Sequence, residues 1–368
     1  MKIKVNGKEF TKILEEISKC INMSNMFLPL RGFLIDVLED RMTITGSDGN
    51  LSTIKTILQK ENFLLIDEPG RILVPSSLLT NIIKKCDGML EMNNSDNILF
   101  INSGKDKYEI NLMEISEYPA IDFALLGIKL TINAKELREA AKNVLFAASS
   151  TDVDVIFNGV NIDYSDNKMK LIATDSYRVA YQEIDVVDSR NVNFNVSLFA
   201  KNLKEFIPEF INGDVEMFVN EYKINLIFDN TIIQSKLIDA PYKDVSKIFP
   251  ETFSKLLTIE KKELIDAINK AIVISSDSFH RLRFEIDQKE IKIISVREEI
   301  GNSVVTIENK SYSGEDFVLT VNYKYLKEAL SVFEGEVKIN FNNSIDRFVI
   351  VGKSNPKNKQ LIAPQRSY

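Results

Sequence analysis

Few side chains in this sequence could carry out catalysis, and they are scattered. The single histidine, His280, stands in Ser-Phe-His-Arg, and no acid or nucleophile accompanies it at a catalytic spacing. Thr174-Asp175-Ser176-Tyr177 offers hydroxyls and a carboxylate, but it lacks a neighbouring base and is typical of a turn. The sequence has no phosphate-binding glycine loop, no Cys-x-x-Cys and no His-Glu-x-x-His. We therefore expect a protein that is not an enzyme and needs no cofactor or metal.

A second chemical feature is a set of cations on helical patterns. Six segments are predicted to be helical: residues 8–22, 75–86, 134–147, 198–211, 260–274 and 323–333. They carry 15 Lys and Arg against 11 Asp and Glu, although the whole chain has a net charge of −7. Twelve of the cations lie opposite the apolar stripe: Lys12, Lys19, Lys84, Lys85, Arg138, Lys142, Lys201, Lys204, Lys262, Lys270, Lys324 and Lys327. Basic faces on helices of an acidic protein indicate attraction to a polyanion such as duplex nucleic acid.

The elements that position these cations repeat along the chain. A helical pattern begins near Glu9, Glu136 and Glu263, at steps of 127 residues, and its apolar residues recur at i, i+3, i+4 and i+7. Each copy has a second helical pattern, carrying Leu78, Leu203 or Leu326. A glycine and an alternating strand pattern follow it, and these glycines are Gly88, Gly213 and Gly335. A fixed period of this kind indicates three copies of one supersecondary unit.

Short segments of alternating apolar and polar residues surround the helices and predict antiparallel sheets with one covered face. The fold class is therefore α+β, with two helices packed on antiparallel sheets in each copy. Proline-bearing extended stretches at residues 117–122 and 240–244 occupy equivalent places in successive copies. We place the domains at residues 1–125, 126–252 and 253–368.

Composition adds little beyond a globular, cytoplasmic protein. Hydrophobic residues make up 44% of the 368 residues and charged residues 27%. The start, MKIKVNGKEF, contains no apolar stretch of signal-peptide length. Cys20 and Cys86 lie in helical patterns away from metal-ligand spacing, so we expect both to be reduced and packed.

Several short motifs occur in an order that resembles the bacterial replicative sliding clamp, the beta subunit of DNA polymerase III. The run Leu-Ile-Ala-Thr-Asp-Ser-Tyr-Arg-Val-Ala at 171–180 resembles that family's A-T-D-G-H-R-L-A. Weaker matches are Leu28-Pro29-Leu30, Asn158-Gly159, Ser-Lys-Leu-Ile-Asp at 235–239, Ser-Tyr-Ser-Gly at 311–314 and Leu-Ile-Ala-Pro-Gln-Arg at 361–366. Together they extend over the whole chain.

The resemblance implies three DNA-clamp domains per chain that close as a dimeric ring, with twelve helices around duplex DNA. It implies a DNA sliding clamp, a non-catalytic processivity factor that encircles double-stranded DNA without sequence preference and tethers the replicative polymerase. The implied partners are the DNA polymerase III alpha subunit, the clamp loader, other proteins with a clamp-binding motif and a second copy of the chain.

By the same resemblance, partners insert a short peptide between the second and third domains. The matching positions are Phe157, Thr174, Ser176, Tyr177, Arg178, Val179, Lys243, Lys247, Ile248, Leu361, Ala363, Pro364, Gln365 and Arg366. Ser176-Tyr177 stands where the family has Gly-His, and Ala363 and Gln365 stand where it has methionines. Because methionine adapts to many ligands, these departures indicate an altered peptide preference.

The family's ring closes head to tail, first domain against third. The matching positions are Val273 and Ile274 on a helix that would end at Ser275, facing Tyr108 and Ile110 on an edge strand. Lys105 and Lys107 lie beside that strand and could pair with Glu298 and Glu299. An edge strand normally needs protection, which pairing with a partner's sheet would supply.

Two alternatives belong to other classes. One is a repeat scaffold that binds peptides but never encircles DNA, and the matched charge on six helix faces argues against it. The other is a hydrolase that uses His280 with a nearby serine.

Overall fold

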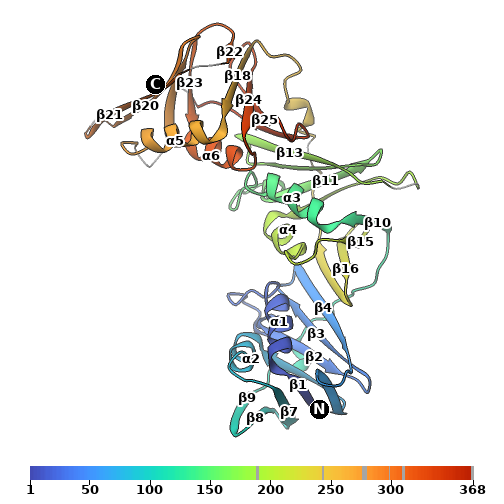
Figure 1. The fold of residues 1–368 in the computed structure, drawn as a ribbon. Helices are drawn as coiled ribbons and strands as arrows, with labels where there is room; N and C mark the ends of the chain where they lie inside the picture. The colour runs from blue at the N-terminus through green and yellow to red at the C-terminus, as the bar shows by residue number, and fades with distance from the viewer. Residues whose placement is uncertain (188–189, 243, 276–279, 298, 309–310, 366–368) are drawn as a thin grey trace. The chain divides into compact units, whose positions relative to one another are not determined.

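The structure is a computed structural model, and it describes residues 1–187, 190–242, 244–275, 280–297, 299–308 and 311–365. The chain divides into two compact units, drawn in Figure 1. The first unit joins Met1–Ala134 to Lys201–Leu237, and the second joins Lys135–Ala200 to Ile238–Tyr368. The middle third of the chain therefore contributes to both. Among the described residues, no helix is long and apolar enough to cross a membrane.

The first unit contains α1 (Gly7–Ser18), α2 (Ser76–Ile83) and nearly all of α4 (Ala200–Phe206). Its strands are β1 (Lys2–Asn6), β2 (Gly32–Val37), β3 (Arg41–Ser47), β4 (Leu51–Leu58), β5 (Leu64–Glu68), β6 (Gly70–Pro75), β7 (Met89–Ser95), β8 (Ile98–Ser103), β9 (Asp106–Asn111), β10 (Ile128–Asn133), β15 (Asp214–Val219), β16 (Lys223–Phe228) and β17 (Thr231–Lys236). They form a five-stranded sheet, β5-β1-β7-β8-β9, and an eight-stranded sheet, β10-β15-β16-β17-β4-β3-β2-β6.

The second unit contains nearly all of α3 (Ala134–Leu145), α5 (Lys261–Ala271) and α6 (Tyr323–Ser331). Its strands are β11 (Gly159–Ser165), β12 (Lys168–Thr174), β13 (Arg178–Asp185), β14 (Phe194–Phe199), β18 (Lys255–Glu260), β19 (Arg281–Ile286), β20 (Glu290–Arg297), β21 (Gly301–Glu308), β22 (Tyr312–Ser313), β23 (Phe317–Asn322), β24 (Glu336–Phe341), β25 (Phe348–Gly352) and β26 (Asn358–Ile362). They form a nine-stranded sheet, β14-β11-β12-β13-β26-β25-β24-β18-β22, and a four-stranded sheet, β21-β20-β19-β23. All the described pairings are antiparallel, as predicted.

The repeated apolar stripe is the buried face of the first helix in each copy. In α1 it consists of Phe10, Ile13, Leu14 and Ile17, all buried in the core of the first unit. The equivalent residues of α3 and α5 are buried too: Leu137, Ala140, Ala141, Val144, Leu264, Ala267, Ile268 and Ala271. The predicted helical period is therefore confirmed at every repeated position.

The repeated glycines close each copy on itself. In every copy the first residue of the first helix donates its backbone N–H to the glycine carbonyl, from Gly7 to Gly88, Ala134 to Gly213 and Lys261 to Gly335, at 2.9, 2.9 and 3.0 Å. The strand after each glycine pairs with the strand before the helix, as β7 with β1, β15 with β10 and β24 with β18. The glycine therefore lies where the chain turns back to pair with the first strand of its own copy.

Strand pairing also joins successive copies. In the first unit, β4 pairs with β17 from Thr231↔Lys55 to Ser235↔Leu51. In the second unit, β13 pairs with β26 from Arg178↔Ile362 to Gln182↔Asn358. We call these two pairings the first and second seams. Strands β9 and β21 each lie at the edge of their sheet.

All six helices are shorter in the structure than predicted, and in two of them the difference changes how the segment is interpreted. The segment 198–211 contains only α4, because Leu198 and Phe199 complete β14 and Pro208 cannot continue a helix. Likewise α5 ends at Ala271, so Val273 and Ile274 lie in the turn beyond it and not on the helix. The run Ile272-Val273-Ile274 is β-branched throughout, which restricts its side chains in a helix.

Both cysteines are free thiols in the buried interior of the first unit, as predicted. Burial raises the pKa of the Cys20 thiol to about 12, and its Sγ lies 2.7 Å from Thr53 Oγ1. The thiol is therefore protonated at neutral pH and poorly reactive.

Replacing Leu14 by Ala tests the buried face of α1. We expect a loss of about 2 to 5 kcal/mol in the free energy of unfolding of the first unit, because the side chain is fully buried. Lys12→Ala, on the exposed side of the same helix, is the matched control and should change stability by less than about 0.5 kcal/mol. Urea unfolding followed by circular dichroism measures both, and equal effects would contradict the assigned face.

Candidate functional sites

In the first unit, the six predicted cations of α1, α2 and α4 and their flanks are exposed: Lys12, Lys19, Lys84, Lys85, Lys201 and Lys204. Lys84 Nζ lies 2.7 Å from Glu15 Oε1, and Lys201 Nζ lies 3.7 Å from Asp48 Oδ2. The Lys84–Glu15 pair is on the surface, where ion pairs add little to stability, and Lys201 is itself 62% exposed. The positive charge of this face therefore remains available to an anionic ligand.

In the second unit, four of the six predicted cations are exposed: Lys142, Lys262, Lys270 and Lys324. Arg138 and Lys327 are half-buried, and Lys327 Nζ donates to Asn269 Oδ1 at 2.8 Å, which ties α6 to α5. These residues lie on the side of each helix that does not enter the core. The helix faces therefore carry their cations toward solvent, as the sequence indicates.

A tight loop between β12 and β13 holds the predicted peptide-contacting residues. Thr174 Oγ1 donates to the Arg178 carbonyl at 2.7 Å and accepts from the Ser176 N–H at 3.2 Å. Asp175 Oδ1 accepts from the backbone N–H groups of Tyr177 and Arg178, at 3.1 and 3.2 Å. Ser176 has a φ of +74°, a conformation that costs about 1 to 3 kcal/mol in a residue with a Cβ. The hydrogen bonds of the loop hold this strained residue in place.

Arg178 is buried beneath this loop, only 7% exposed. Its Nε donates to Asp175 Oδ2 at 3.0 Å, its Nη2 to the Phe146 carbonyl at 2.5 Å, and its Nη1 to the Glu328 carboxylate. The guanidinium carbon also lies 4.3 Å from the ring centroid of Tyr325 and 5.3 Å from that of Phe146. The resemblance implies that Arg178 belongs to the peptide site, and in the structure all three guanidinium nitrogens already donate to protein acceptors.

Tyr177 forms the outer end of this aromatic stack. Its ring is 6.5 Å from that of Tyr325, nearly parallel to it, and the side chain is 64% exposed. An exposed ring with one face already stacked offers its other face to a ligand.

The tail residues continue alongside the loop. The Ala363 N–H donates to the Tyr177 carbonyl at 2.9 Å, and the Gln365 N–H to the Thr320 carbonyl at 2.7 Å. Leu361 belongs to β26 and packs with Val179 in an apolar cluster with Ile172, Val245 and Val349. Leu361 and Val179 are therefore brought together as the resemblance implies. Sequence reasoning did not name the other members, Ile172, Val245 and Val349, as site residues.

The remaining residues predicted for the peptide site have hydrogen-bond partners outside the Thr174–Arg178 loop. Phe157 lies in the short helix Val155–Asn158, and its carbonyl accepts from the Ser149 N–H at 2.7 Å. Lys247 and Ile248 end the short helix Ser246–Ile248, and the Ile248 carbonyl accepts from Arg347 Nη1 at 3.1 Å. Pro364 is half-buried. Lys243 and Arg366 lie outside the described residues.

The residues predicted for subunit contact lie at or near two edge strands, β9 and β21. Tyr108 and Ile110 share the inner face of β9, where Tyr108 is half-buried and Ile110 belongs to the core. Lys105 and Lys107 are exposed beside them. In the second unit Val273 is 81% exposed, Ile274 is half-buried and Glu299 is exposed, whereas Glu298 lies outside the described residues. Sequence reasoning missed the exposed aliphatic side chains near the edge β21, which are Val296, Ile300 and Val304.

The contacts of His280 are those of a residue that stabilises the fold. It has a φ of +52°, its Nδ1 lies 3.1 Å from the Tyr323 hydroxyl, and its carbonyl accepts from the Tyr323 N–H at 2.8 Å. These contacts fix the entry to α6.

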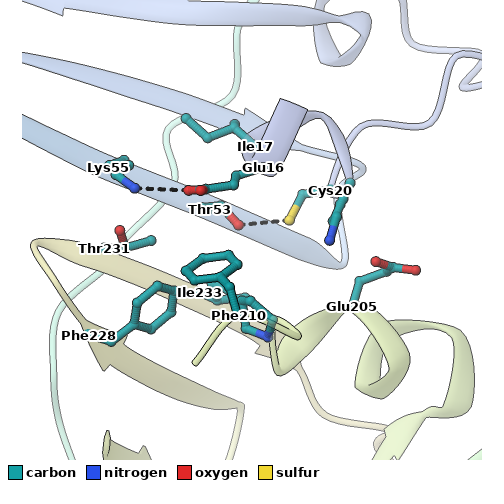
Figure 2. Close-up of a pocket in the computed structure, with 12 residues that line it drawn as sticks. Glu16, Ile17, Cys20, Thr53, Lys55, Glu205, Phe210, Phe228, Thr231 and Ile233 are labelled. Carbon is teal, nitrogen blue, oxygen red and sulfur yellow. Dashed lines mark hydrogen bonds and ion pairs between the residues drawn. The ribbon is translucent and has the colours of Figure 1, made fainter. Parts of the chain in front are cut away.

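A pocket lies at the first seam, on the helix side of the sheet (Figure 2). Glu16 Oε2 and Lys55 Nζ are 2.9 Å apart across it, and the rings of Phe210 and Phe228 meet edge to face with centroids 6.0 Å apart. Its lining consists of Glu16, Ile17, Lys19, Cys20, Thr53, Lys55, Glu205, Pro208, Phe210, Phe228, Thr231 and Ile233. The second seam has a hydrogen bond at the corresponding positions, from Asn143 Nδ2 to Gln182 Oε1 at 2.9 Å.

Three family models match successive parts of the chain. They describe the DNA polymerase III beta subunit: its N-terminal domain matches residues 1–122, its central domain residues 131–244 and its C-terminal domain residues 246–366. Together they account for nearly the whole sequence.

Individual relatives agree with these models. The beta sliding clamp of Mycoplasmopsis pulmonis is 30% identical over the full length of both chains. The solved sliding clamp of Bacillus subtilis matches with a TM-score of 0.95 at 24% identity, and the beta subunit of Streptococcus pyogenes DNA polymerase with 0.92 at 26% identity, each over the whole of both chains. The fold is therefore the three-domain clamp fold, and the chain belongs to the family of bacterial DNA polymerase III beta subunits, the beta sliding clamps.

Proposed function

We propose that this chain works as the DNA sliding clamp of its family: a homodimeric ring that encircles duplex DNA and tethers the replicative polymerase. The family is a non-catalytic processivity factor of DNA polymerase III. We further propose a cytoplasmic location and domain limits near residues 125 and 252. One observation carries the proposal of a ring: the repeat leaves one strand pairing incomplete within the chain.

The order of strands supports this argument. Strands β4, β13 and β21 occupy equivalent places in the three copies, as do β9, β17 and β26. β4 pairs with β17, and β13 pairs with β26, but β21 and β9 each end a sheet. Pairing β21 of one chain with β9 of another would repeat the same seam between subunits. Because each chain has one edge of each kind, a closed ring of two chains would contain two such seams.

The chemistry of the two edges favours the same pairing. Val273 and Val304 present exposed aliphatic surface on one side, and the half-buried ring of Tyr108 lies on the other. Lys105 and Lys107 beside β9 would meet Glu299, which is exposed just before β21. Complementary charge of this kind selects the head-to-tail orientation.

The cations of the helix faces support binding of duplex DNA inside the ring. Twelve Lys and Arg side chains per chain are distributed over six helices and their flanks instead of gathering in one cleft. Contacts of this kind neutralise phosphates without reading bases, so the ring can slide.

The partner site is proposed at the second seam. There the loop from Thr174 to Arg178, the apolar pair Val179 and Leu361 and the tail Ala363–Gln365 adjoin one another. An apolar floor with polar groups at its rim suits a short peptide. We propose that the peptide comes from the DNA polymerase III alpha subunit, the clamp loader or another protein with a clamp-binding motif.

The dimer seam can be tested with Val273→Ala and Val304→Ala in one chain. Removing both exposed side chains should weaken dimerisation by about 2 to 3 kcal/mol, roughly 30-fold to 150-fold in Kd, while the monomer still folds. Sedimentation at nanomolar concentration measures the monomer fraction. Val153→Ala is the control, since Val153 is also an exposed valine but lies far along the chain from both edges. A double variant that dimerises like the control would place the interface elsewhere.

Charge reversal tests the helix faces. Lys12, Lys204, Lys262 and Lys324 changed to Glu should weaken retention on nicked circular DNA, and the dependence on salt should fall by about 0.9 in log–log slope for each lost phosphate contact. The control reverses four exposed cations outside the helices, Lys4, Lys60, Lys289 and Lys338. Equal losses in both proteins would indicate a general charge effect. A wild-type chain that binds partner peptides but never stays on circular DNA would instead be a scaffold.

Ending the chain after Ile362 tests the peptide site. Leu361 and Ile362 must be kept, because both are buried in β26, whereas residues 363–368 follow the last strand. We expect peptides from the polymerase III alpha subunit to lose at least about tenfold in affinity while the ring remains dimeric. Fluorescence anisotropy with a labelled peptide measures this loss, and a peptide with its apolar anchors changed to Ala is the control. Unchanged affinity would move the site away from the tail.

A further inference from the structure

Arg178 joins three parts of the second unit that are distant in sequence. Asp175 belongs to the loop at the proposed peptide site, Phe146 follows α3 in the second copy, and Glu328 lies on α6 in the third copy. The side chain is 7% exposed, and each guanidinium nitrogen donates to one of these three partners. The planar fork of arginine places N–H donors on three separate nitrogens, which suits acceptors on three sides of the side chain.

The bond to Glu328 also affects the charge that α6 presents. Glu328 is the one carboxylate among Tyr323–Ser331, and the helix carries two of the proposed DNA-facing cations, Lys324 and Lys327. Lys324 and Glu328 are four residues apart, a spacing at which helical side chains are neighbours. Glu328 is 48% exposed, and its pairing with Arg178 partly neutralises a charge that would otherwise offset that of Lys324. The helix can then attract phosphate more strongly than its own sequence would allow.

We infer that Arg178 is a positioning residue that serves two surfaces at once. It anchors the loop at the peptide site to the helices, and it withholds Glu328 from the cations of α6. The inference rests on the proposed function, and it adds that the peptide site and the DNA-facing helix are coupled through one ion pair. A peptide that disturbs the loop changes the electrostatics of α6, and DNA on α6 changes the loop in return.

The coupling predicts effects of opposite sign on DNA for the two partners of the ion pair. Glu328→Gln removes the carboxylate, so binding to a 30-base-pair duplex at 50 mM salt should become about twofold to fivefold tighter. Arg178→Met frees Glu328 to face Lys324, so the same duplex should bind about twofold to fivefold more weakly. Both variants loosen the loop, so both should bind a labelled polymerase III alpha peptide about threefold to tenfold more weakly.

A double-mutant cycle separates this mechanism from a simple change of net charge. In the Glu328→Gln background, Arg178→Met should no longer weaken duplex binding, because α6 then has no carboxylate to be released, and Asp175 stays bonded to backbone N–H groups of its own loop. Glu334→Gln is the matched charge control: Glu334 is exposed just beyond α6 and lies 3.6 Å from Lys261 Nζ. It should leave peptide binding unchanged and should tighten duplex binding less than Glu328→Gln does. Circular dichroism and sedimentation verify that each variant is folded and dimeric.

The outcomes distinguish this inference from the proposed function. A wild-type ring that binds neither peptide nor duplex would overturn the proposed function itself. A wild-type ring that binds both, with duplex effects of Arg178→Met and Glu328→Gln that simply add, would overturn the coupling alone. If Arg178→Met fails to fold, the cycle is repeated with Arg178→Lys, which keeps one charge but loses the fork. Additive effects in that cycle would overturn the inference equally.

Discussion

Antiparallel pairing between strands of different copies is the interaction on which the rest of the structure depends. Each copy packs its own helices on its own strands, and it leaves one strand at either end with unpaired backbone groups. In the first unit β4 meets β17, and in the second β13 meets β26, so these edges complete one another. An uncovered edge would invite uncontrolled association. Pairing between successive copies therefore covers these edge strands and fixes which strand pairs with which.

This constraint explains why functional residues gather at the second seam. The loop Thr174–Arg178 begins the strand that crosses from the second copy, and Leu361 lies in the strand that receives it. Polar side chains and the tail therefore meet at a place fixed by backbone pairing on both sides. A loop held in this way can keep Ser176 in a left-handed conformation, because its hydrogen bonds offset the cost.

Much of the fold was predictable from the sequence because helix faces have a strong period. The stripe that includes Phe10, Leu137 and Leu264 gave three helices and their buried sides at once. The environment of Arg178 was not predictable, since Glu328 is 150 residues away and only the folded seam brings the two together. The position of Val273 was misjudged because an apolar pattern continues past Ala271, although the β-branched residues there favour a turn. Periodicity identifies faces well, whereas ends of elements and long-range polar partners depend on tertiary packing.

The seams also differ in the polar side-chain bond that spans each pairing on the side facing the helices. This difference is relevant to where a ring would open. At the first seam Glu16 and Lys55 form an ion pair, and at the second Asn143 and Gln182 form an amide hydrogen bond. In the third copy the corresponding residues are Lys270 and Val305, which cannot bond to each other in either way. A seam formed there between two chains would depend on backbone pairing, apolar contact and the charges of the partner. Such a joint lacks the polar bond that reinforces the other two, which favours opening between subunits over opening within a chain.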